Sequence, residues 1–139
     1  MGDSAPGTCG ELRVGETKLE AVMRGAGDTI LFLHPEIGLD PKLPALDALA
    51  KSARLLAPSH PGFGRSELPK GFNHIDDLAY FYLDFIREMH LDRVHIVGSS
   101  IGGWLALEIA VRDGSRIASL VLVAPSGIQI PGVQTGDIF

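Results

Sequence analysis

The sequence predicts an α/β fold in which a mostly parallel sheet carries helices on both faces. Short apolar runs that suit strands alternate with segments whose apolar residues recur at helical spacing. Several of the runs are continuously apolar, which is typical of strands that are buried on both faces. The chain has 139 residues, of which 45% are hydrophobic, and this is enough for one domain with such a core.

The first half of the chain is expected to start with a tail and a hairpin. We expect residues 1–10 to be flexible and residues 11–139 to form one domain, with strands at 11–14 and 18–24 around a turn at 15–17. Thr29–His34 is a short apolar run and is expected to be a buried strand. A helix is expected next, because apolar residues recur at helical spacing at Leu43, Leu46, Leu49 and Ala53. The following strand is expected at residues 54–58.

The second half repeats the alternation. Residues 59–69 are rich in Pro, Gly and Ser and are expected to be a loop. Asp76 is expected to cap a helix, whose apolar face consists of Leu78, Phe81, Tyr82, Phe85, Ile86 and Met89. We expect strands at 93–98 and 118–124 and, between them, a helix at 101–112. That helix is expected to be deeply buried because it is apolar nearly all round, at Trp104, Leu105, Leu107, Ile109 and Val111.

Composition excludes several classes of function. The net charge is −5, and the sequence has no long run of acidic or basic residues, so no basic surface for a nucleic acid is expected. No apolar run is long enough to span a bilayer, and the N-terminus lacks the features of a secretory signal. Cys9 is the only cysteine, so no internal disulfide is expected and a cytoplasmic location is the default. No Cys/His spacing resembles a metal site, and no cofactor is expected.

A nucleophile is predicted where the strand at 93–98 meets the following helix. The segment Gly98-Ser99-Ser100-Ile101-Gly102 has the G-x-S-x-G form of a nucleophile elbow. Such an elbow lifts its serine to the carboxyl end of a central strand, and glycines flank it because side chains would collide where the backbones approach. We therefore predict Ser100 as the nucleophile, supported by Gly98 and Gly102. The alternative is a plain strand-to-helix turn whose serine only caps the helix.

Two backbone N–H groups are predicted to form an oxyanion hole. The N–H of Ile101 lies at the start of a helix, where the helix dipole also favours negative charge. A second donor is expected from the loop after Thr29–His34, and Glu36 is the candidate because Pro35 has no N–H. His34 is expected to support this loop; alternatively, it only closes the strand and bonds locally. The Glu36 side chain is expected to be a solvated surface carboxylate, and the alternative is that it faces substrate. His60 is expected to be a structural loop residue rather than a catalytic one.

Taken in order, four segments make the chain resemble the serine-nucleophile branch of the α/β-hydrolase fold family. The resemblance runs from about Leu19 to Gly127, and the segments are 31–34 with its loop, 60–66, 97–103 and 120–125. It implies a mostly parallel sheet with Ser100 as nucleophile, and a triad completed in the order Ser, acid, His. Haloalkane dehalogenases and soluble epoxide hydrolases are similar but carry Asp at the elbow, so Ser100 speaks against both.

The chain departs from the family pattern in sequence and in length. Pro35 replaces the glycine usual after the oxyanion-loop histidine, and Ser59 stands where many relatives have Asp. Family members usually have ~250 residues, so we interpret the chain as the N-terminal portion of such a domain, without its last strands and lid. No histidine follows His95, and none of the later carboxylates is well placed as the acid; they are Glu108, Asp113 and Asp137.

The resemblance implies a serine hydrolase that acts through an acyl-enzyme on a small ester, thioester or activated C–C bond. Without the histidine and the acid, we expect the chain alone to be inactive. The expected partner is a small-molecule substrate, with no nucleic acid or membrane. One alternative is a receptor or pseudoenzyme on the same fold, which loss of the downstream acid and His would favour. Another is a cofactor-free haloperoxidase-like enzyme, which only assays with peracid or halide substrates would separate.

If the chain is the N-terminal portion of a longer domain, it is expected to be poorly soluble by itself. In the family, further strands follow the strand expected at 118–124, so in this chain it becomes a bare apolar edge that invites pairing and aggregation. We expect the isolated chain to be poorly soluble, with aggregates in gel filtration. A stable, soluble monomer would contradict this.

Overall fold

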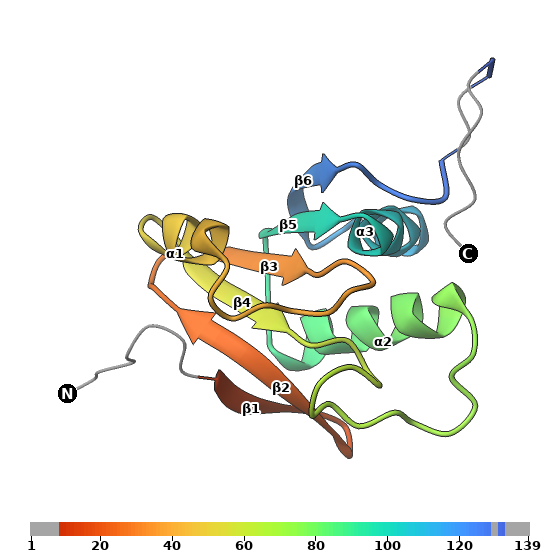
Figure 1. Ribbon diagram of the computed structural model, residues 1–139, viewed down its shortest axis with the longest axis horizontal. Coiled ribbons are helices and arrows are strands. Elements are labelled where there is room, and N and C mark those ends of the chain that lie inside the picture. The colour runs from red at the N-terminus through yellow and green to blue at the C-terminus, as the bar shows by residue number, and fades with distance from the viewer. Residues whose placement is uncertain (1–8, 129–130, 133–139) are drawn as a thin grey trace.

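The computed structural model describes residues 9–128 and 131–132. In this part of the chain, six strands form one sheet in the order β1-β2-β4-β3-β5-β6, and three helices pack against it (Figure 1). In chain order the elements are β1 (Cys9–Val14), β2 (Thr17–Arg24), β3 (Thr29–Leu33), α1 (Pro44–Ala50), β4 (Arg54–Pro58), α2 (Ile75–Glu88), β5 (Val94–Ser99), α3 (Ile101–Arg112) and β6 (Ile117–Val123).

The sheet is parallel from β4 through β3 and β5 to β6, and antiparallel where β1 and β2 join it. In the centre of the sheet, Leu31 of β3 is paired with Leu56 of β4 on one side and with Ile96 of β5 on the other. All three side chains are buried. The prediction of an α/β fold with a mostly parallel sheet is therefore confirmed.

The helices cover both faces of the sheet, because successive side chains of a strand point to opposite sides. Leu31 and Leu33 of β3 belong to the core under α2 and α3, whereas Phe32 packs with Leu46 of α1 in a separate core. Figure 1 shows α2 and α3 lying together and α1 apart from them. This alternation is the reason why β3 reads as a continuous apolar run.

The connections place a crevice between the carboxyl ends of β3 and β5. From β3 the chain continues through α1 to β4, and from β5 it continues through α3 to β6 on the other side. Ligands of open α/β sheets bind where strand order reverses in this way, because the two loops diverge and leave space between them. The loop at residues 34–38 and the start of α3 border this crevice.

Two boundaries at the ends of elements differ from expectation. Strand β1 begins at Cys9, so Cys9 and Gly10 pair with β2 and are not part of the predicted tail; residues 1–8 lie outside the described residues. Helix α2 begins at Ile75 with His74 as its cap, so the prediction that Asp76 caps it is wrong. The Asp77 carboxylate instead accepts hydrogen bonds of 3.0 Å from the backbone N–H groups of Asn73 and His74, which is the N3 half of a capping box.

Two helices are shorter or less buried than expected. Helix α1 ends at Ala50, so Ala53 is not helical, and the helix starts at Pro44, whose fixed φ suits a first helical position. Helix α3 is buried on only one side, because its other side carries Val111, which is 78% exposed. Beside it, β6 is an edge strand of the sheet, and Val121 and Val123 are each 52% exposed. An all-round apolar pattern therefore did not imply all-round burial.

Leu46 is the most deeply buried contact of α1 with the sheet, and Leu43, Leu49 and Ala50 pack beside it. Leu46 is the only buried residue of α1 and is 0% exposed. We expect Leu46→Ala to lower the free energy of unfolding by about 2–5 kcal/mol, because it leaves a cavity beneath the helix. Urea denaturation followed by circular dichroism measures this change. The control, Val111→Ala on the exposed side of α3, is expected to stay within about 0.5 kcal/mol, and an equal effect of the two variants would contradict the assignment.

Candidate active site

Ser100 lies on a strained turn between β5 and α3. Its φ of 53° and ψ of −114° fall in a backbone region that residues other than glycine rarely adopt. Backbone hydrogen bonds hold the turn: the N–H of Ser100 donates to Val123 (2.9 Å), and its carbonyl accepts from Gly103, Trp104 and Ser126 at 2.9, 3.2 and 3.0 Å. Strand β6, the segment that follows it and the first turn of α3 thus fix the position of this serine.

The glycines around Ser100 are required by close backbone packing. A Cβ at Gly98 would overlap the carbonyl group of Gly102, and a Cβ at Gly102 would overlap the carbonyl oxygen of Leu33 at the end of β3. The steric argument made from the sequence for these two positions therefore agrees with the structure. Gly103, for which no role was predicted, is also constrained, because its Cβ would lie 2.8 Å from that of Pro125.

The side chain of Glu36 reaches the predicted nucleophile. The Ser100 hydroxyl donates to Oε1 of Glu36 at 3.1 Å, and the N–H of Ile101 donates to Oε2 at 3.4 Å. The carboxylate is exposed to solvent, as expected, and its two oxygens also contact the elbow. Neither periodicity nor a motif indicates this contact, because it joins residues 64 and 65 positions apart.

The donors around Glu36 act on its ionisation. Hydrogen bonds from its own backbone N–H, from the Ser100 hydroxyl and from the Ile101 N–H lower the pKa of the Glu36 carboxyl below its ordinary value. The Ile101 N–H, predicted for the oxyanion hole, and the predicted nucleophile therefore both donate to one anion. The arrangement can hold negative charge beside the Ser100 hydroxyl.

A second hydroxyl lies next to Ser100. The Oγ of Ser126 is 3.2 Å from the Oγ of Ser100, and the Ser126 N–H donates to the Ser100 carbonyl. The sequence analysis did not identify Ser126. One feature of the sequence could have indicated its place at the site: Ser126 follows the strand expected at 118–124. The carboxyl ends of neighbouring parallel strands meet at one edge of the sheet, so a residue after that strand lies near the end of β5.

Two buried histidines fix the loop that carries Glu36. The N–H of His60 donates to Nε2 of His34 at 2.8 Å, and Nε2 of His60 is 2.9 Å from the carbonyl oxygen of His34. A carbonyl only accepts, so His60 carries its proton on Nε2, and its Nδ1 accepts from the Tyr82 hydroxyl at 2.7 Å. His34 in turn donates from Nδ1 to the carbonyl of Pro35 at 2.6 Å.

This histidine pair connects the loops after β3 and β4. His34 is 0% and His60 1% exposed, their ring centroids are 3.7 Å apart, and the ring of Phe63 packs against both. His34 thus closes β3 and bonds locally, and the same bonds fix the backbone that leads to Glu36. Both ring nitrogens of His60 are engaged, which agrees with the structural role expected for it.

Burial keeps both histidines neutral. Desolvation lowers the pKa of His34 below its ordinary value, and desolvation together with the neighbouring His34 lowers the pKa of His60 to about 3. Burial also raises the pKa of the Tyr82 hydroxyl. The cluster therefore stays uncharged and hydrogen-bonded at neutral pH, which suits positioning rather than proton transfer.

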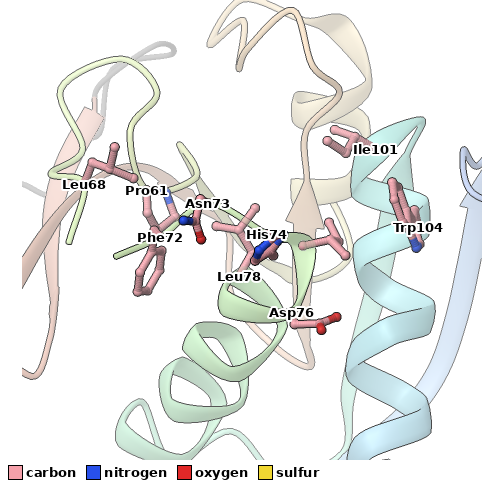
Figure 2. Close-up of a pocket in the computed structure, with 10 residues that line it drawn as sticks. Pro61, Leu68, Phe72, Asn73, His74, Asp76, Leu78, Ile101 and Trp104 are labelled. Atoms are coloured by element: carbon pink, nitrogen blue, oxygen red, sulfur yellow. The ribbon is translucent and has the colours of Figure 1, made fainter. Parts of the chain in front are cut away.

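A largely apolar pocket of about 500 Å³ opens beside Ile101 (Figure 2). Figure 2 shows Ile101 and Trp104 of α3 facing the loop before α2 and the first turn of that helix. Trp104, for which core packing was the preferred interpretation, thus lines the pocket, and its indole N–H donates to Glu108 at 3.2 Å. The other lining residues are Pro61, Leu68, Phe72, Asn73, His74, Ile75, Asp76 and Leu78.

The carboxylates that follow Ser100 in sequence have other partners. Glu108 pairs with Arg112, and Asp113 accepts from the N–H of Ser115 at 3.0 Å; Asp137 lies outside the described residues. Within residues 9–128 and 131–132, no group of three or more His, Cys, Asp or Glu side chains could hold a metal ion. No helix in this part of the chain is long and apolar enough to cross a membrane.

Comparison with known proteins relates most of the chain to one family. The sequence profile described as alpha/beta hydrolase fold matches residues 29–135. The chain is 31% identical over 115 residues to 2-hydroxymuconate semialdehyde hydrolase of Pseudomonas sp. strain CF600, covering 77% of this chain and 40% of that protein. It is 36% identical over 104 residues to the dihydrolipoyllysine-residue acetyltransferase component of the acetoin cleaving system of Cupriavidus necator, covering 74% of this chain and 28% of that protein.

Solved structures agree with the sequence comparison. The chain is similar to the crystal structure of a variant of CumD, a meta-cleavage product hydrolase of Pseudomonas fluorescens IP01, with a TM-score of 0.75 and 25% sequence identity. The match covers 88% of this chain and 47% of the hydrolase chain. The chain thus spans less than half the length of each of these three proteins.

The buried histidine pair predicts how stability depends on pH. The folded-state pKa of His60, about 3, lies below the ordinary value of 6.5 for an unfolded chain. Between these values the unfolded state binds a proton that the folded state does not, so stability falls as pH falls, by up to about 1.4 kcal/mol per pH unit. Urea denaturation of the intact protein that carries this sequence, between pH 7 and pH 4, is expected to show a shallower pH dependence for His60→Gln than for the unsubstituted protein. The control, His90→Asn at an exposed position, should keep the original slope, and an unchanged slope in His60→Gln would contradict the assignment.

Proposed function

The chain belongs to the alpha/beta hydrolase fold family, and we propose that Ser100 is the nucleophile of a serine hydrolase. The proposed substrate is a small molecule with an ester, a thioester or an activated C–C bond. One observation carries the proposal: the Ser100 hydroxyl and the N–H of Ile101 both donate to a single anion, the Glu36 carboxylate. Two of the similar proteins are named as hydrolases, which supports the reaction class.

In the proposed reaction, the Oγ of Ser100 attacks the carbonyl carbon of the substrate. The Ser100 proton passes to a histidine that this chain does not contain and then to the leaving group, whose bond to the acyl carbon breaks. Water then attacks the acyl-serine and releases the acid. The strained turn contributes by presenting Oγ at the carboxyl end of β5, where the crevice between β3 and β5 opens.

The N–H groups of Ile101 and Glu36 are proposed to hold the oxyanion that forms during attack. Donors fixed before the reaction stabilise developing charge without reorganisation, and removing one such donor typically costs on the order of 10²–10³ in kcat. The His34–His60 contacts support this role, because they fix the loop from which the Glu36 N–H projects. The largely apolar pocket beside Ile101 suits an uncharged part of the substrate.

A binding protein on the same fold is the second candidate, and one observation favours it. The Ser100 hydroxyl donates to a carboxylate rather than to a histidine, and in a receptor or pseudoenzyme such a contact would simply order the pocket. A histidine and an acid downstream of the described residues would favour catalysis, and other residue types at those positions would favour binding.

Labelling with a fluorophosphonate tests the proposed nucleophile. The experiment uses the intact protein that carries this sequence, because the proposed base lies outside the chain. We expect stoichiometric labelling that Ser100→Ala abolishes, since only an activated serine reacts. Ser99→Ala is the matched control, one position away and unable to replace Ser100 at the elbow, and should label normally. Labelling that persists in Ser100→Ala would defeat the proposal.

A further inference from the structure

We propose that Glu36 determines specificity at the Ser100 site: its carboxylate selects substrates whose acyl group carries no negative charge near the reacting carbonyl, and it is displaced when the oxyanion forms. The inference rests on the proposed function of Ser100 and deepens it. Nothing in the α/β-hydrolase pattern of the sequence requires a carboxylate at this position; the proposal comes from the contacts of Glu36.

The carboxylate and a substrate oxyanion compete for the same donors. Oε1 of Glu36 accepts from the Ser100 hydroxyl, and Oε2 accepts from the N–H of Ile101. A tetrahedral intermediate on Ser100 would place its own negative oxygen near the Ile101 N–H, so both anions cannot occupy that position. Substrate therefore binds productively only after the carboxylate moves.

The carboxylate can leave without disturbing the loop. Glu36 is exposed, so its side chain can rotate toward solvent, whereas the preceding backbone is fixed by His34 and its partner His60. The Glu36 N–H, the proposed second donor, stays on this fixed backbone, and the Ile101 N–H becomes available to the oxyanion. One residue thus supplies both a donor for the transition state and a removable anion.

The displaced carboxylate stays at the mouth of the site as an uncompensated charge. Among the described residues, the ion pairs join other groups, and none involves Glu36. Two like charges 4 Å apart in water disfavour each other by about fivefold in binding, and more where solvent is partly excluded. An acyl group with a carboxylate next to the carbonyl is therefore rejected, and a cationic group there is attracted.

The adjoining pocket fits the same preference. Its walls beside Ile101 are mainly apolar, and the one carboxylate among its lining residues, Asp76, is paired with Arg112 at 2.8 Å. An uncharged body in this pocket, with a neutral or cationic group near the carbonyl, satisfies both surfaces. We therefore assign the site to neutral or amine-bearing acyl compounds rather than to acyl compounds with a second carboxylate.

The first experiment measures binding and does not depend on catalysis. Benzoate, benzamide and benzylamine share a ring and differ in charge, and the amide resonance of Ile101 in the intact protein reports binding at this position. We expect benzylamine to bind most tightly and benzoate least tightly. In Glu36→Gln, which keeps the shape and removes the charge, benzoate should gain about fivefold to tenfold in affinity and benzylamine should lose a similar factor.

Asp40→Asn is the matched control, because it removes a carboxylate four positions after Glu36. The Asp40 carboxylate accepts a hydrogen bond from the N–H of Lys42 at 2.9 Å. The control variant should leave all three affinities unchanged. The proposal is overturned if Glu36→Gln behaves like Asp40→Asn, or if none of the three compounds shifts the Ile101 resonance.

The second experiment separates this inference from the proposed nucleophile. Rates of hydrolysis are compared for p-nitrophenyl esters of valeric acid, of succinic acid and of 4-aminobutyric acid. The kcat/KM for the succinate ester relative to the valerate ester should rise about fivefold to tenfold in Glu36→Gln, and an unchanged ratio would overturn the inference. If Ser100→Ala keeps fluorophosphonate labelling while Glu36→Gln still reverses the order of ligand binding, the proposed nucleophile fails and the charge selection stands.

Discussion

The close approach of α3 to the end of β3 determines the geometry of the whole site. The α-carbon of Gly102 lies so near the carbonyl of Leu33 that no side chain fits between them. This contact brings the first turn of α3, with the Ile101 N–H, against the loop that follows β3. Because the next residue of that helix, Gly103, also packs closely on Pro125, the segment after β6 lies at the same point. Three segments far apart in sequence thus meet around Ser100.

The His34–His60 pair supplies the other half of this arrangement. A helix pressed against β3 would position nothing if the loop beyond β3 could move, and the two histidines prevent this with bonds to backbone groups of both loops. Their burial has a cost: an imidazole that ionises at about pH 3 in the fold gives up stability in mild acid. The same pair fixes the backbone that leads to Glu36, whose carboxylate contacts Ser100.

Sequence reasoning could predict the parts of the structure that local rules decide. The run at β3, the helical spacing in α2 and the glycines at 98 and 102 each follow from periodicity or steric limits within a few residues. The contacts of Glu36, Ser126 and His60 could not be predicted in this way, because each depends on which loops the sheet order brings together. The burial of α3 was overestimated for a related reason: an all-round apolar sequence shows what a helix could bury, whereas the surrounding elements decide what it does bury, and Val111 remains exposed.

The Glu36 contact limits what this carboxylate can do in a reaction. Three hydrogen bonds stabilise its charged form and lower its pKa, and a carboxylate that is stabilised in this way binds a proton weakly. It is therefore a poor acceptor for the proton of a serine hydroxyl, although it lies only 3.1 Å from Oγ. A general base is effective when its pKa lies near the working pH, and hydrogen bonds from the oxyanion donors shift Glu36 in the opposite direction. In the proposed reaction, proton transfer from Ser100 therefore uses another group, and the proposed role of Glu36 is that of an anion that occupies the donors until a substrate replaces it.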